Sequence, residues 1–138
     1  MKLVLAEKPS VAQSIAKVLK ADKRCDGYLE GNDYVVSWCV GHLVELAQPE
    51  NYDIKYTKWK YDDLPIIPTS WLYRVSSTTN KQFRIIKKLM ERSDIDGLIC
   101  ATDAGREGEL IFRLVYHQCH CQKPFERLWI SSMQDSAI

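Results

Sequence analysis

Residues 98–114 read LICATDAGREGELIFRL. An apolar run stops before Asp103, charged residues follow, and a second apolar run begins at Leu110. A short apolar run is typical of a strand buried on both faces, whereas the apolar residues from 110 to 115 recur at the spacing of one helix face. The stretch therefore predicts a buried strand at 97–102, a charged turn and a helix.

The N-terminal residues repeat this organisation. KLVLA at 2–6 predicts a second buried strand, and Glu7 and Lys8 follow it as a charged turn. Pro9 suits the first turn of a helix, because the N–H that proline lacks has no partner there in any case. Two strand–turn–helix units, far apart in the sequence, thus carry charged residues at the same point.

The rest of the chain adds strands and one more long helix. WLYRV at 71–75 and RLWIS at 127–131 predict strands, residues 78–90 predict a helix capped by a threonine, and MQDSAI at 133–138 resembles the start of a further helix. Strands that alternate with helices predict an α/β fold, with a parallel or mostly parallel sheet and helices on both faces.

Two segments depart from this alternation. DGYLEG and DYVVSWCV, within residues 26–40, predict a small hairpin whose turn contains Gly31 and Asn32. Residues 45–68 lose all periodicity and are rich in proline and aromatic residues, which predicts a long loop. A loop of this length in a small domain is usually functional or ordered by its own side chains.

Length and composition predict one domain, residues 1–138, with a sizeable core. The chain is 46% apolar and 27% charged, as in globular proteins, and no apolar run reaches the roughly 18–20 residues of a membrane span. With no signal peptide either, we expect a cytoplasmic protein with no membrane partner. The abrupt end suggests a domain cut from a longer polypeptide.

Charge and cysteine content point to no particular partner. The net charge of +1 neither indicates nor excludes nucleic acid. Basic residues gather between 81 and 92, where a solvated helix face is the simpler interpretation than a binding strip. HQCHC at 117–121 offers metal-ligand types, but zinc sites usually draw ligands from separate segments. We therefore interpret it as the end of a helix.

Three carboxylates are expected to meet at one edge of the sheet. Ligands of open α/β sheets bind beyond the carboxyl ends of the strands, and Glu7 and Asp103 follow two such strands. Glu107 lies about one helical turn beyond Asp103. Because three close carboxylates repel one another, a hard cation such as Mg²⁺, which prefers oxygen ligands, is the economical partner.

Basic residues at the same turns favour phosphate. Lys8 and Arg106 stand at predicted helix N-termini, where free N–H groups already attract anions. Gly105 and Gly108 allow a bulky group to approach the backbone. His42 is either a turn residue or a phosphate contact. The alternative to a site is structural, since acids in a first helical turn also serve as helix caps and dipole partners.

Five segments together resemble the N-terminal Toprim domain of type IA DNA topoisomerases, and the bacterial topoisomerase III branch most of all. They are AEKPSVAQSIAKVL, GHL at 41–43, WKYDDLPIIP at 59–68, ATDAGREGELIFR and RLWISSMQDSAI. The resemblance runs from Met1 to Ile138 and implies the Toprim fold, a compact Rossmann-like α/β domain.

The resemblance also implies a reaction. A tyrosine attacks a phosphodiester of single-stranded DNA to form a 5′-phosphotyrosine, another strand passes, and the break is resealed with Mg²⁺ but without ATP. Glu7 matches the family's acid/base glutamate, Lys8 the lysine that neutralises the scissile phosphate, and Asp103 and Glu107 the metal-binding acids. The nucleophilic tyrosine belongs to a later domain of the same polypeptide, so this chain alone is expected to be inactive. Such a protein is expected at the nucleoid.

One residue departs from the family pattern. Many members carry Asp-x-Asp-x-Glu, whereas this chain has Gly105 in the middle position. One cation held by Glu7, Asp103 and Glu107 is therefore expected rather than two. Two other functions stay open: a primase-like or nuclease-like Toprim enzyme, and a non-catalytic module that binds DNA or nucleotide phosphate.

Overall fold

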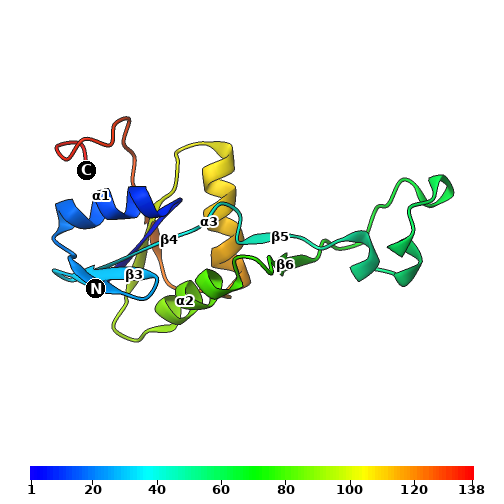
Figure 1. Cartoon of the computed structure of the whole chain (residues 1–138), viewed down its shortest axis with the longest axis horizontal. Coiled ribbons are helices and arrows are strands. Elements are labelled where there is room, and N and C mark those ends of the chain that lie inside the picture. The colour runs from blue at the N-terminus through cyan, green and yellow to red at the C-terminus, as the bar shows by residue number, and fades with distance from the viewer.

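Six strands form one sheet, in the order β2-β3-β4-β1-β7-β8, in the computed structural model, which describes residues 1–138 (Figure 1). Their bounds are β1 (Lys2–Ala6), β2 (Lys23–Cys25), β3 (Tyr28–Gly31), β4 (Tyr34–Trp38), β7 (Gly97–Ala101) and β8 (Phe125–Arg127). The pairs β1–β4, β1–β7 and β7–β8 are parallel, and β2–β3 and β3–β4 are antiparallel. The expected mostly parallel sheet is confirmed.

Three helices cover the two faces of the sheet. They are α1 (Pro9–Leu19), α2 (Asn80–Glu91) and α3 (Arg106–Gln118). One cluster of buried side chains joins α1 to the sheet, and a larger cluster joins α2 and α3 to it. In Figure 1, α1 accordingly lies apart from α2 and α3, across the strands. No helix of the structure has both the length and the apolar character needed to cross a membrane.

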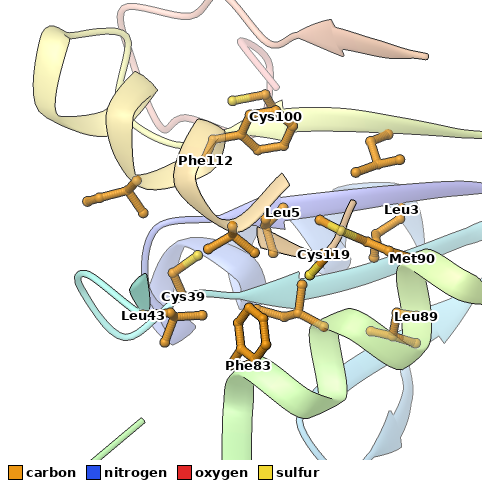
Figure 2. Close-up of a cluster of buried hydrophobic side chains, with 14 of the residues drawn as sticks. Leu3, Leu5, Cys39, Leu43, Phe83, Leu89, Met90, Cys100, Phe112 and Cys119 are labelled. Carbon is orange, nitrogen blue, oxygen red and sulfur yellow. The ribbon is translucent and has the colours of Figure 1, made fainter. Parts of the chain in front are cut away.

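Alternation along the buried strands explains both clusters. In β1, Leu3 and Leu5 belong to the larger cluster, whereas Val4 and Ala6 belong to the smaller one, because successive residues of a strand face opposite sides. Figure 2 shows the larger cluster, in which the sulfur atoms of cysteines lie among Leu3, Leu5, Phe112 and neighbouring apolar side chains. Both faces of the central strands are therefore buried, as the continuous apolar runs indicate.

The predicted hairpin is present, but it belongs to the main sheet. β3 and β4 pair around Asn32 and Asp33, both of which have positive φ, and β4 continues the sheet beside β1. The edge strand β2 was not expected. Its sequence, KRC, is largely exposed and has no apolar alternation, so the sequence carries no strand signal there.

Two expectations at the C-terminus were wrong. The last strand is β8, which ends at Arg127. It therefore shares only one residue with the predicted strand 127–131. Its neighbour β7 ends at Ala101, and the last backbone bond between the two segments runs from Leu128 N–H to the Cys100 carbonyl, after which residue 129 has no strand to pair with. Residues 133–138 form only a turn and no helix.

The predicted long loop is a projecting arm. β5 (Val44–Leu46) and β6 (Tyr73–Val75) form a separate two-stranded antiparallel sheet, so only the last part of the predicted strand 71–75 is extended. Between them the chain makes three short 3-10 turns, at Pro49–Asn51, Ile54–Thr57 and Tyr61–Asp63. We call residues 47–72 the arm; Figure 1 shows that it extends well away from the body.

Candidate active site

The site is built where β1 and β7 end. These neighbouring strands are parallel, with Ala6 opposite Ala101, so the residues that follow them emerge at the same edge of the sheet. Glu7 comes one residue after β1, and Asp103 comes two residues after β7. This edge is the one at which open α/β sheets bind their ligands.

Glu7 and Asp103 lie against each other. Partial burial raises the pKa of the Glu7 carboxyl, and a shared hydrogen bond with Asp103, together with the charge of Asp103, raises it further. The charge of Lys8 lowers the pKa of Glu7, and the charge of Glu107 raises it slightly. Glu7 thus holds its proton more firmly than an ordinary glutamate does, because it is partly buried and a second carboxylate faces it.

The charge of Glu107 affects the pKa of Glu7, but its side chain contacts a different residue. The Nε2 atom of His42 contacts a carboxylate oxygen of Glu107, and both side chains are exposed to solvent. His42 lies between β4 and β5, so this contact joins the root of the arm to the first turn of α3. No group of three or more His, Cys, Asp or Glu side chains is arranged to hold a metal ion.

Two of the three candidate phosphate contacts, Lys8 and Arg106, lie at helix N-termini, whereas His42 lies between β4 and β5. Lys8 is the N-cap residue of α1, with extended backbone, and no side-chain bond caps that helix end. Arg106 is the first residue of α3, whose N-cap is Gly105, again without a side-chain cap. Both helices therefore present uncapped backbone N–H groups at this edge, where the helix dipole favours an anion.

Gly108 sets the packing between α3 and the Asp103 turn. A Cβ atom added to Gly108 would lie 2.1 Å from the backbone oxygen of Asp103, so no side chain fits. The glycine was expected to make room for a ligand, whereas it makes room for the chain itself. Gly105 does have open space, with no atom within 4 Å of an added Cβ.

Arg127 supports the same turn and was not anticipated from the sequence. Its guanidinium donates a 2.7 Å hydrogen bond to the Thr102 carbonyl and a 3.3 Å bond to the Thr102 hydroxyl, and it also pairs with Glu109. Arg113 and Arg127 together hold the pKa of Glu109 below its usual range. Glu109 is therefore paired with two arginines. A single arginine in a predicted strand does not indicate that its side chain binds the backbone of a distant turn.

A cleft opens beside Asp103. Its volume is about 300 Å³, and it lies between α1 and the segment after β8, with Val11, Ile15, Asp103, Leu128 and Met133 among the residues that line it. None of the seven tyrosines of the chain lines this cleft. Of the acid pair, only Asp103 lines this cleft.

The HQCHC segment is a helix end. α3 ends at Gln118, and Cys119, its C-cap residue, is buried in the larger core cluster. Cys121 packs against the same cluster, whereas His117 and His120 are exposed. The basic residues between 81 and 92 lie mainly on exposed positions of α2, although Arg92 is bound to Glu30 and Asp94.

The comparison with known proteins agrees with this geometry. The family model described as "Toprim domain" matches residues 2–133, nearly the whole chain. The chain therefore belongs to the Toprim domain family.

Among curated proteins, the chain is 53% identical over 136 residues to DNA topoisomerase 3 of Bacillus thuringiensis (strain Al Hakam) and 49% identical to that of Bacillus subtilis (strain 168). DNA topoisomerase 3 of Bacillus licheniformis is 50% identical. Each alignment covers 99% of this chain but only 19% of the relative, so the chain spans about a fifth of the length of these proteins.

Proposed function

We propose that this chain is the phosphate-binding and metal-binding half of the active site of a type IA DNA topoisomerase. The whole enzyme would act on single-stranded DNA at the nucleoid. The observation that carries the proposal is the contact between Glu7 and Asp103 at the carboxyl edge of two parallel strands, beside two uncapped helix N-termini. The similarity to proteins named DNA topoisomerase 3 supports the same function.

The donor set suits a hard cation. Glu7 and Asp103 are two close carboxylates, and Mg²⁺ is commonly held by one or two carboxylates together with water and substrate phosphate. Glu107 contacts His42 through one carboxylate oxygen, so its other oxygen could join them. With Gly105 where many members of the family carry an acid, we propose one cation rather than two. When bound, the ion would neutralise the repulsion between the carboxylates and the charge of the DNA phosphate.

Glu7 is the residue that we propose to move the proton. The raised pKa of its carboxyl means that it keeps a proton nearer to neutral pH than a free glutamate does, as a general acid requires. During cleavage it would protonate the 3′-oxygen that leaves the phosphorus atom, and during rejoining it would take that proton back. Lys8, at the start of α1, would bind the scissile phosphate and offset the charge that develops on it.

The nucleophile is proposed to lie elsewhere in the polypeptide. No tyrosine lines the cleft at Asp103, and the relatives are about five times longer than this chain. The tyrosine that forms the 5′-phosphotyrosine would therefore come from another domain, and strand passage would require no ATP. The isolated chain is accordingly expected to form no covalent adduct with single-stranded DNA.

The decisive experiment compares two glutamines in the full-length protein. Glu7→Gln should lower the rate of single-strand cleavage and of relaxation by about 10²–10⁴-fold, because it removes the transferable proton. Glu126→Gln, at an exposed position of β8, is the matched control and should leave both rates unchanged. Relaxation should need a divalent cation and no nucleotide. Full turnover by Glu7→Gln would contradict the proposal and favour a non-catalytic phosphate-binding module.

The other Toprim enzymes are separated by using the 138-residue chain alone. Incubation with Mg²⁺ and linear DNA, or with nucleoside triphosphates, should give neither hydrolysis nor polymerisation. Either product would indicate a nuclease-like or primase-like enzyme instead, because only such an enzyme would complete its reaction without a second domain.

A further inference from the structure

The arm carries most of the exposed apolar surface of this molecule. Of thirteen large apolar side chains that are exposed, nine lie between residues 46 and 73, and none of the arm residues 47–72 is buried. These nine are Leu46, Ile54, Trp59, Tyr61, Leu64, Ile67, Trp71, Leu72 and Tyr73. Exposed apolar side chains gathered in this way mark a surface that another molecule or domain covers.

Part of this exposed apolar surface lines a groove. Its volume is about 520 Å³, and none of its ten lining residues is charged. The indole rings of Trp59 and Trp71, which are 69% and 58% exposed, lie along it together with three prolines. Prolines and aromatic rings lose little conformational entropy when they are covered, so a groove of this composition suits a permanent apolar contact.

The groove is held open by the arm's own bonds. The Tyr52 hydroxyl accepts a 2.6 Å hydrogen bond from the Leu72 N–H, and the Ala47 N–H donates a 2.8 Å bond to the Leu72 carbonyl. Further along, the Asp53 carboxylate accepts a 3.0 Å bond from the Lys55 N–H. The groove thus exists before anything binds, which reduces the ordering cost of binding.

The charge of the arm argues against nucleic acid as the occupant. Residues 47–72 contain three lysines and four acidic residues, and no basic residue lines the groove. Binding to a DNA backbone depends on Lys and Arg contacts to phosphate, which this surface does not offer. The occupant is therefore apolar and close to neutral, as the centre of a protein–protein contact is.

The length of the relatives identifies the source of that occupant. Because the chain spans 19% of the proteins it resembles, most of such a polypeptide lies outside this domain and is tethered to it. We infer that the arm docks its Trp59–Trp71 groove onto an apolar ridge of another domain of the same polypeptide. The inference rests on the proposed function, since it assumes the longer topoisomerase chain.

Oxidative footprinting tests this directly. The full-length protein and the 138-residue chain receive the same dose of hydroxyl radicals, and oxidation of the groove residues Trp59, Leu64 and Trp71 is measured by mass spectrometry. We expect these residues to be oxidised roughly fivefold less in the full-length protein, because residues at the centre of an interface are desolvated. Equal oxidation in both proteins would overturn the inference.

Two variants of the full-length protein sharpen the result. Trp59→Ser combined with Trp71→Ser should abolish the protection of Leu64, since it removes the apolar anchors. Lys55→Ser combined with Lys58→Ser, on the same arm but outside the groove, is the matched control and should keep that protection. Protection of Leu64 that survives the loss of both tryptophans would contradict docking through the groove.

The other occupants give distinct outcomes, each of which overturns the inference. Protection that appears in the 138-residue chain as its concentration rises, together with a dimer in sedimentation, would indicate a second copy. Protection that appears only after single-stranded DNA is added would indicate nucleic acid. The Glu7→Gln assay on the same preparations keeps the two proposals separate, because a loss of turnover without any arm protection would retain the enzyme and reject the docking.

Discussion

At the scale of single residues, the site combines an unfavourable contact with a tight one. Glu7 and Asp103 are two acids held together, although their charges repel. Gly108 allows α3 to approach the backbone of Asp103 more closely than any side chain would permit. The first feature is typical of functional sites, which accept lower stability in exchange for chemistry, and the second fixes the turn that carries it.

Removing the ionisable group of Glu7 should stabilise the domain at neutral pH. The pKa of Glu7 is higher in the folded chain than in the unfolded chain, so the folded state binds its proton more tightly and loses stability as the pH rises through that pKa. Glu7→Gln cannot ionise, and we expect a gain of about 0.5–1 kcal/mol at pH 7, the scale of interactions between partly exposed charges.

The same reasoning fixes the pH dependence of this gain. The advantage of Glu7→Gln should shrink as the pH falls below the raised pKa of Glu7, because wild-type Glu7 is then protonated as well. Urea denaturation of both proteins at several pH values measures this. A constant difference, or a loss of stability at pH 7, would show that the contact with Asp103 is not repulsive.

Adding one methyl group at Gly108 should be costly. Gly108→Ala places a Cβ against the Asp103 backbone, which cannot move aside as a flexible side chain would, and we expect a loss of about 1–3 kcal/mol in the free energy of unfolding. Gly105→Ala, three residues earlier, meets no atom and should change stability by less than about 1 kcal/mol. Equal effects of the two substitutions in urea denaturation would contradict this account.

At the scale of elements, the sequence predicts the strand–turn–helix units well and their long-range partners poorly. The meeting of Glu7 and Asp103 could be predicted because an apolar run, a charged turn and a helix recur twice, and buried parallel strands end at a common edge. That prediction assumed that β1 and β7 are neighbours, and the structure shows that they are.

The contacts that the sequence did not predict involve residues without any local sequence pattern. The contact between His42 and Glu107 spans 65 positions, and the bonds from Arg127 to Thr102 span 25. The strand β2 was missed because an edge strand paired on one side needs no apolar pattern. Local periodicity cannot reveal such pairings, which depend on how the finished elements meet.

The buried cysteines of the core should be chemically inert. Burial raises the pKa of Cys39 and of Cys119 to about 12, and it also raises the pKa of Cys100. At neutral pH a thiol with a pKa of about 12 has roughly a thousandfold less thiolate, the reactive form, than an unperturbed one. Cys25 and Cys121 are partly exposed to solvent.

We therefore expect two classes of thiol in a labelling experiment. A disulfide reagent at pH 7.5 should modify Cys25 and Cys121 in the folded protein, and the other three cysteines only after denaturant is added. Peptide mapping identifies the labelled positions. Rapid modification of Cys39 in the native protein would show that the core opens readily between α2, α3 and the sheet.

At the scale of the whole molecule, the chain consists of a body with two core clusters and an arm that contributes to neither. The Toprim body was predictable because its elements are regular. The arm was predictable only as a long loop, because its 3-10 turns and its groove depend on proline and aromatic contacts without periodicity.

Deleting the arm should leave the body folded. Leu46 and Tyr73 are paired in the two-stranded sheet, so an Asn-Gly turn in place of residues 47–72 can close a two-residue hairpin. Because no residue of the arm is buried, we expect the free energy of unfolding to stay within about 1 kcal/mol of the parent, with a single cooperative transition. Calorimetry checks this, and a broad or absent transition would show that the arm is part of the core.

The connection between the arm and the site has a spectroscopic consequence. Leu43 and Val44 are fixed in the larger cluster immediately after His42, whose imidazole contacts Glu107 on α3. A movement of the two-stranded sheet β5–β6 that displaces Leu43 and Val44 must therefore alter the surroundings of the His42 imidazole. The chemical shifts of the His42 ring protons should thus report on the angle between the arm and the body, without an attached label.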